Sequence, residues 1–134
     1  MLNIKKLLYK IIWHIDPMQI GASGTVTVNS AAYRDVCSVT LQPNSKYVVL
    51  ADLNSNNGSQ HAVMCNIVVT SGTPLENFGH GMSRVMIIAG GGTTSWKYIR
   101  TGDSTVTVTL RNYGYFTTSH QEVGHLFAWR IGGA

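Results

Sequence analysis

Residues 104–111 read Ser-Thr-Val-Thr-Val-Thr-Leu-Arg, and this stretch decides the fold class of the chain. Apolar and hydroxyl-bearing side chains alternate in it, and a period of two is that of a β-strand with one buried and one exposed face. Val106, Val108 and Leu110 are therefore expected to face a core, with the threonines between them facing outward. The stretch predicts one strand of an antiparallel sheet.

Similar strand patterns recur over most of the remaining chain. Further strands are expected over residues 25–28, 35–41, 46–54, 61–70, 82–89, 95–100 and 124–131. Residues that favour turns separate them, at 42–45, 54–59, 71–81 and 90–92. About eight short strands at regular spacing predict an all-β domain over residues 24–134, built as an antiparallel β-sandwich or jelly roll.

The first 18 residues follow a different period. Apolar residues recur there at alternating steps of three and four with lysines opposite, which predicts a short amphipathic α-helix. The helix should end near Asp16, because the residue before Pro17 is pushed out of the α region. A secretory signal peptide is disfavoured because Lys10 interrupts the apolar stretch.

A lone helix of about 15 residues is marginal in water, so its apolar stripe needs a partner. That partner is its own domain, a membrane surface or copies of itself. The heptad spacing favours a self-associating bundle. The residues expected to mediate oligomerisation are Ile4, Leu8, Ile11 and Ile15.

The amino-acid composition and charge indicate which partners the protein could have. Only 12% of the 134 residues are charged, against about 25% in a typical soluble domain. The expected outward faces carry Thr, Ser, Asn and Tyr instead of Lys and Glu, which protects weakly against association and indicates self-assembly. The net charge is +4, but beyond the first ten residues the basic side chains are scattered singly. We therefore expect no nucleic-acid partner, and no apolar run is long enough for membrane insertion.

Several stretches together resemble a known family. They read Gly-Thr-Val-Thr-Val at 24–28, Tyr-Arg-Asp-Val-Cys-Ser-Val-Thr-Leu at 33–41, Pro-Asn-Ser-Lys-Tyr-Val-Val-Leu at 43–50, Ser-Thr-Val-Thr-Val-Thr-Leu at 104–110 and Phe-Ala-Trp-Arg-Ile at 127–131. As a pattern of strands and turns, this succession resembles the C-terminal head domains of bacteriophage tail fibres and receptor-binding proteins. The trimeric jelly roll of the tumour-necrosis-factor superfamily is similar in shape.

The resemblance implies a homotrimeric jelly-roll head of a phage tail fibre or related tail device, with residues 1–18 as its neck. Such a head belongs to the virion, acts outside the cell, contacts other tail proteins and binds bacterial surface polysaccharide. A non-catalytic structural or assembly protein of the virion is the alternative, and a polysaccharide-degrading enzyme is a third.

The motifs that could carry catalysis or metal binding are incomplete. His120-Gln-Glu-Val-Gly-His125 places its histidines five apart in a β context, whereas a zinc-protease helix needs them four apart. A polar loop leading into the last strand is expected there instead, although a metal held by His120 and Glu122 stays open. Cys37 and Cys65 are expected as buried free thiols. We expect no enzyme activity, metal or cofactor.

Saccharide binding combines aromatic faces with hydrogen-bonding side chains, which loops and strand ends present well. The stretch Arg-Asn-Tyr-Gly-Tyr-Phe-Thr-Thr-Ser-His at 111–120 is the most informative, because two tyrosines flank a glycine. Those tyrosines could instead close one end of the sandwich or line a trimer interface. The candidate saccharide-binding residues are Trp96, Tyr98, Arg100, Asn112, Tyr113, Tyr115 and His120.

Overall fold

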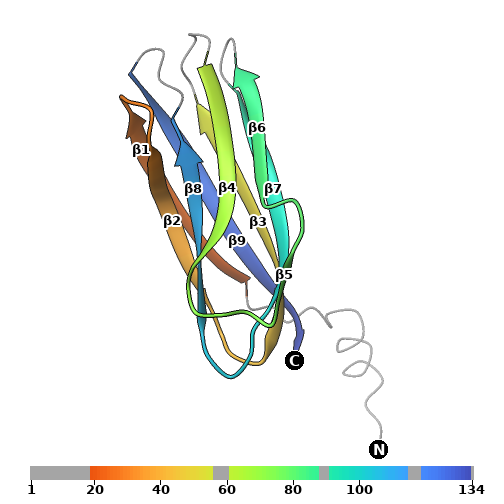
Figure 1. The fold of residues 1–134 in the computed structure, drawn as a ribbon. Coiled ribbons are helices and arrows are strands. Elements are labelled where there is room, and N and C mark those ends of the chain that lie inside the picture. Colours follow the sequence, from red (N-terminus) through yellow and green to blue (C-terminus); the bar gives the residue numbers. More distant parts are fainter. Residues whose placement is uncertain (1–18, 56–60, 88–90, 115–118, 134) are drawn as a thin grey trace, which may run out of the picture.

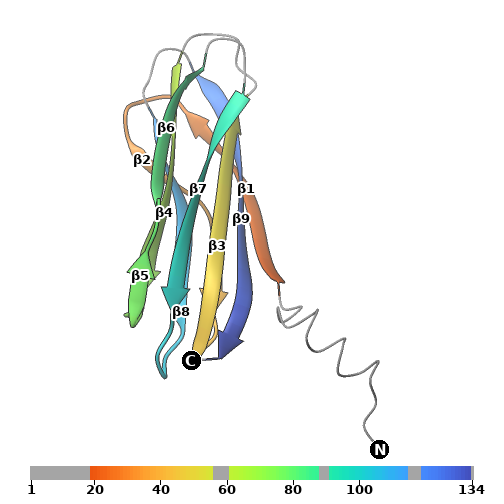
Figure 2. The same ribbon diagram turned by 90° about the vertical axis from the view of Figure 1, so that its right-hand side faces the viewer.

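The computed structural model describes residues 19–55, 61–87, 91–114 and 119–133, which form two packed antiparallel sheets (Figures 1 and 2). Nine strands lie within these residues. They are β1 (Gln19–Val28), β2 (Tyr33–Leu41), β3 (Ser45–Ser55), β4 (His61–Ser71), β5 (Glu76–Phe78), β6 (Met82–Ile87), β7 (Gly91–Arg100), β8 (Val106–Tyr113) and β9 (His120–Gly133).

The strand order is that of a jelly roll. The five-stranded sheet runs β1-β9-β3-β7-β5, and the four-stranded sheet runs β2-β8-β4-β6. The antiparallel pairs are nested, β1 with β9, β2 with β8, β3 with β7 and β4 with β6, as in one long hairpin rolled into two layers. Figure 2 shows the two layers, with β3, β7 and β9 in one and β4, β6 and β8 in the other. The predicted all-β sandwich is confirmed.

The core lies between the two sheets and follows the predicted alternation. Val106, Val108 and Leu110 are completely buried, together with Tyr47 and Leu126 from the opposite sheet. Tyr47 keeps its hydroxyl paired, because the backbone N–H of Gln42 donates to it at 3.0 Å.

Thr109 points outward as expected, yet only 2% of its surface is exposed. Its hydroxyl lies 2.7 Å from that of Ser38 on β2 and 2.8 Å from that of Thr70 on β4. The outer face of the four-stranded sheet therefore carries a chain of hydroxyl groups, which satisfy one another across three neighbouring strands.

Several strand boundaries differ from those predicted. β1 begins at Gln19, because pairing with β9 continues through the small residues before Gly24. Gly91 and Gly92 lie in β7, paired with β3, so the expected glycine turn was wrong at these two positions. β9 begins at His120, so the polar loop expected from that residue was also wrong.

β5 is an additional edge strand in a segment expected to be a loop. Its three residues are too short for a periodic signal, and pairing with β7 defines it. The helix expected over residues 1–18 lies outside the described residues. Across the part of the chain that the structure describes, no helix has the length and apolar character needed to cross a membrane.

Candidate functional site

The outer face of the five-stranded sheet gathers large apolar side chains. Cross-strand register places them in two adjacent rows. We call this surface the aromatic face, and it consists of Trp129, Val48, Tyr98 and Phe78 in one row and Phe127, Leu50 and Trp96 in the next.

The aromatic face is open to solvent over much of its area. The exposed fractions are 54% for Phe78, 45% for Trp96 and 40% for Trp129. The rings of Phe78 and Tyr98 contact each other with centroids 4.8 Å apart. Beside Trp96 lies a hollow of about 360 Å³, lined also by Leu50, Asp52, Thr94 and Phe127.

Charged groups flank the aromatic face without entering its two rows. On one side, Arg100 forms an ion pair of 2.6 Å with Glu76. On the other, Nδ1 of His125 lies 2.7 Å from Oδ1 of Asp52, and the His125 ring stacks parallel to Phe127. An uncharged aromatic centre with a polar rim is the usual anatomy of a protein interface.

A second cluster lies on the outer face of the other sheet, where β2 pairs with β8. Tyr33 and Tyr113 are opposite each other, with ring centroids 4.8 Å apart in an edge-to-face arrangement. The neighbouring pair is Asp35 and Arg111, whose Nε donates to Oδ1 of Asp35 at 2.7 Å. Asn66 on β4 lies opposite Arg111. We call these five residues the tyrosine site.

The tyrosine site is exposed and electrically balanced. Tyr33 is 62% exposed, and the side chains of Asp35 and Arg111 are 58% and 31% exposed. The hydrogen bond to Asp35 raises the pKa of the Arg111 guanidinium, so the two groups remain an ion pair. The site thus presents an aromatic ring beside a carboxylate, a guanidinium and an amide.

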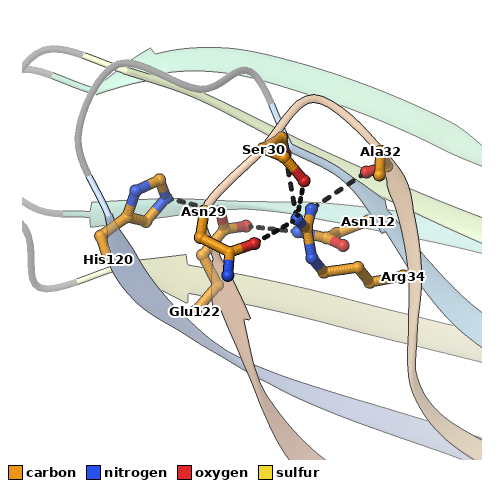
Figure 3. Close-up of polar contacts among 7 residues, drawn as sticks. All are labelled: Asn29, Ser30, Ala32, Arg34, Asn112, His120 and Glu122. Carbon is orange, nitrogen blue, oxygen red and sulfur yellow. Dashed lines mark hydrogen bonds and ion pairs between the residues drawn. The ribbon is translucent and has the colours of Figure 1, made fainter.

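Arg34 holds the turn that leads into Tyr33 (Figure 3). Its guanidinium donates to the carbonyl oxygen of Ala32 at 3.1 Å and to that of Ser30 at 3.0 Å. It also donates to the Ser30 hydroxyl and to Oδ1 of Asn29 at 3.1 and 3.2 Å. The Arg34 side chain therefore forms hydrogen bonds to three residues of the connection between β1 and β2.

A buried polar cluster lies beside this turn. Figure 3 shows Glu122 between His120 and Asn112, and Glu122 is completely buried. Nε2 of His120 lies 2.8 Å from Oε2 of Glu122, and Nδ2 of Asn112 donates to Oε1 at 3.3 Å. A buried carboxylate needs such partners. His120 and Asn112 thus provide Glu122 with two hydrogen bonds inside the sandwich.

The structure separates the predicted saccharide-binding residues. Trp96, Tyr98 and Arg100 share the outer face of β7, so three of them are brought together. Asn112 and His120, which were expected to bind saccharide, instead point inward to Glu122 and are buried. A ligand at the surface cannot reach them. Alternation explains this placement, because Asn112 shares the inward face of β8 with Leu110 and Val108.

Other predicted residues lie elsewhere. Tyr113 belongs to the opposite sheet from Trp96. Tyr115 lies outside the described residues, as do the predicted oligomerisation residues Ile4, Leu8, Ile11 and Ile15.

Sequence reasoning missed Tyr33, Asp35, Phe78, Phe127 and Trp129 as surface groups. For Phe127 and Trp129 a signal was present, because they alternate with Leu126 and Ala128, which are buried. Tyr33 and Asp35 gave no such signal, since their partners Tyr113 and Arg111 are far away in sequence.

The cysteines are both free, as expected. Cys65 is buried, and burial raises the pKa of its thiol from 9.0 to about 12. Cys37 is only half-buried, which departs from the prediction, and burial followed by the Asp52 charge raises its pKa to about 11. Thiols with such raised pKa values are poor nucleophiles near neutral pH. Among the described residues, no group of three or more His, Cys, Asp or Glu side chains could hold a metal.

Comparisons with known proteins identify no family. No protein-family model and no curated protein matches the chain. Among solved structures, the infectious bursal disease virus VP2 subviral particle is similar at a TM-score of 0.28 with 7% identity, covering 88% of this chain and 42% of that chain. The Gx strain of that virus gives a TM-score of 0.29 with 10% identity, covering 90% and 42%. The chain spans less than half the length of these neighbours, and similarity this low carries no argument about function.

Proposed function

We propose that the protein is a non-catalytic receptor-binding head of a phage tail fibre or related tail device, which assembles as a homotrimer and binds bacterial cell-surface saccharide. The observation that supports this proposal is the contrast between the two outer faces. One is aromatic and uncharged at its centre, which suits contact with other copies. The other carries hydroxyl groups and the tyrosine site, which suit contact with saccharide.

A second copy of the chain is the occupant that best fits the aromatic face. With about 150–250 Å² for a whole aromatic side chain, the exposed fractions of Phe78, Trp96 and Trp129 leave roughly 100 Å² on each. Stable interfaces bury about 800 Å² on each partner, so this face is large enough to form the apolar centre of one. The low overall charge of the chain favours the same arrangement.

The start of β1 gives a further argument. Gln19 pairs with Trp129, so β1 begins at the edge of the aromatic face. Copies that meet through this face would bring their N-terminal segments close together. The apolar stripe of Ile4, Leu8, Ile11 and Ile15 could then form the expected bundle.

Light scattering of the full-length protein tests the assembly. We expect three copies for the wild type and dissociation for Leu50→Glu, which places a charge at the centre of the aromatic face. Leu75→Glu is the matched control, because Leu75 is also exposed, at 59%, but lies outside the two rows. A monomeric wild type at high concentration would overturn the assembly, and would favour residues 1–18 of the same chain as the occupant.

The same preparation tests the saccharide proposal against its alternatives. Binding to purified host polysaccharide without release of reducing ends supports a receptor-binding head. The aromatic face would serve a structural protein of the virion equally well, and assembly without binding to host cells or polysaccharide would favour that function. Release of reducing ends would show an enzyme and overturn the non-catalytic proposal.

A further inference from the structure

We infer that the tyrosine site binds a neutral saccharide with vicinal hydroxyl groups, a site and ligand class that deepen the proposed function and rest on it. Three properties of this exposed sheet face support such binding. These are the open Tyr33 ring, the hydrogen-bonding atoms of the Asp35–Arg111 pair that contact no other described residue, and the balance of charge between those two side chains.

The ring supplies the apolar part of the site. Tyr33 is the most exposed large apolar or aromatic residue among those whose side-chain exposure the structure describes, with 62% of its surface open. Its edge-to-face contact with Tyr113 holds the ring in place, and the turn tied by Arg34 fixes the backbone before it. The apolar C–H face of a sugar ring packs on such a platform, and a platform already held in place loses little conformational entropy on binding.

The neighbouring row supplies the polar part. The contact between Asp35 and Arg111 uses only Oδ1 and Nε. Among the described residues, neither Oδ2 of Asp35 nor either Nη atom of Arg111 has a hydrogen-bond partner. One sugar hydroxyl can donate to Oδ2 while its neighbour accepts from Nη. Vicinal hydroxyls have the spacing to contact both groups at once, and Asn66 on the adjoining strand offers a donor and an acceptor beside them.

Charge decides between neutral and anionic saccharides. The Arg111 guanidinium is already neutralised by Asp35, whose side chain is 58% exposed. Arg34 is committed to the turn through Asn29 and Ser30. The exposed Asp35 carboxylate would repel a carboxylate or phosphate on the ligand. No residue of the tyrosine site offers an unpaired cation to offset this repulsion, so a neutral saccharide is favoured.

The hydroxyl chain extends the site along the sheet. Ser38 on β2 and Thr70 on β4 expose their hydroxyl groups beyond Asp35 and Arg111, and the buried hydroxyl of Thr109 lies between them. Further units of an oligosaccharide would therefore lie over neutral hydroxyl groups instead of charged side chains.

The test measures binding of single oligosaccharides to the full-length protein, so that avidity does not contribute. The probes are neutral hexose and N-acetylhexosamine oligosaccharides, with uronic-acid and phosphate-substituted counterparts. An array identifies the probes that bind, and titration in solution gives the affinity of a single site. We expect neutral probes to bind and Tyr33→Ala to weaken their affinity by about tenfold or more. Arg111→Lys should weaken it as well, because Lys lacks the planar fork of donors.

Two controls separate loss of the site from loss of the fold. Tyr33→Phe keeps the aromatic ring at the same position and should therefore retain more of the wild-type affinity than Tyr33→Ala, whereas equal losses for the two variants would contradict the role of the ring. Leu75→Ala removes a similarly exposed side chain outside the site and should not change the affinity.

The other outcomes contradict the site, the ligand class or the proposed function. If neutral probes bind and neither Tyr33→Ala nor Arg111→Lys changes their affinity, saccharide binding at the tyrosine site is overturned, but the proposed function is not. Binding of anionic probes alone would overturn the ligand class. Failure of every probe and of whole host polysaccharide to bind would overturn both the inference and the proposed function.

Discussion

Glu122 shows how a single residue can constrain one end of the sandwich. Its carboxylate is fully buried, and His120 and Asn112 supply the hydrogen bonds that replace water. Glu76 is a carboxylate on the surface, where its side chain is 41% exposed and pairs with Arg100. Solvent screens an exposed pair, whereas removal of a buried carboxylate leaves its partners unsatisfied. The two glutamates should therefore differ in their effect on stability.

We expect Glu122→Ala to lower the free energy of unfolding by about 3 kcal/mol, because Nε2 of His120 and Nδ2 of Asn112 lose their buried hydrogen bonds to Glu122. Chemical denaturation of the variant and the wild type measures the difference. Glu76→Ala is the control and should cost less than about 1 kcal/mol. Equal losses for the two variants would contradict the role assigned to the buried cluster.

At the scale of elements, close packing of β1 against β2 closes the edge between the two sheets. A Cβ atom on Gly24 would overlap the carbonyl oxygen of Val36, so the strands can approach this closely only where the side chain is absent. Gly24 pairs with Gly124 on β9, where a Cβ would collide with Leu110 of the opposite sheet. Glycine is needed at these positions because the two sheets approach each other closely, and not because the backbone turns.

Gly24→Ala should therefore destabilise the protein by about 1–3 kcal/mol, because β1 must move away from β2. Thermal and chemical unfolding of the variant measure this loss. Gly132→Ala is the matched control, since the nearest atom to its added Cβ is 3.9 Å away, on Lys46. That variant should be neutral or slightly more stable. An unchanged Gly24→Ala protein would show that the sheets can separate there at little cost.

At the scale of the whole molecule, the proposed function assigns assembly to one outer face and ligand binding to the other. The aromatic face lies on the five-stranded sheet and the tyrosine site on the four-stranded sheet. Copies joined through the first would therefore leave the second accessible. Several weak sites held together bind a dense surface much more tightly than one, because later binding events occur at high effective concentration.

Dissociation of the assembly should therefore weaken binding to a dense surface without changing the individual site. We expect Leu50→Glu to lower the apparent affinity for immobilised polysaccharide by about 10²-fold or more, with the affinity for a single soluble oligosaccharide unchanged. Surface plasmon resonance and solution titration measure the two quantities. Equal binding of the monomeric variant and the wild type to the surface would show that avidity plays no part.

The sequence by itself determined the fold class and the inward face of each periodic strand. Val106, Val108 and Leu110 alternate with threonines, and side-chain direction in a strand is a local property that needs no knowledge of the partner strand. Edge strands without that period, such as β5, exist only through pairing with a neighbour, so local reasoning could not find them.

The tertiary structure alone decided strand order, register and the composition of the candidate sites. Asp35 and Arg111 are separated by 76 positions in sequence and meet through the pairing of β2 with β8. Phe78, Tyr98 and Trp129 come from three strands and form one row only in the observed order. Such contacts depend on which distant strands pair and in what register, and neither follows from the period of a single strand.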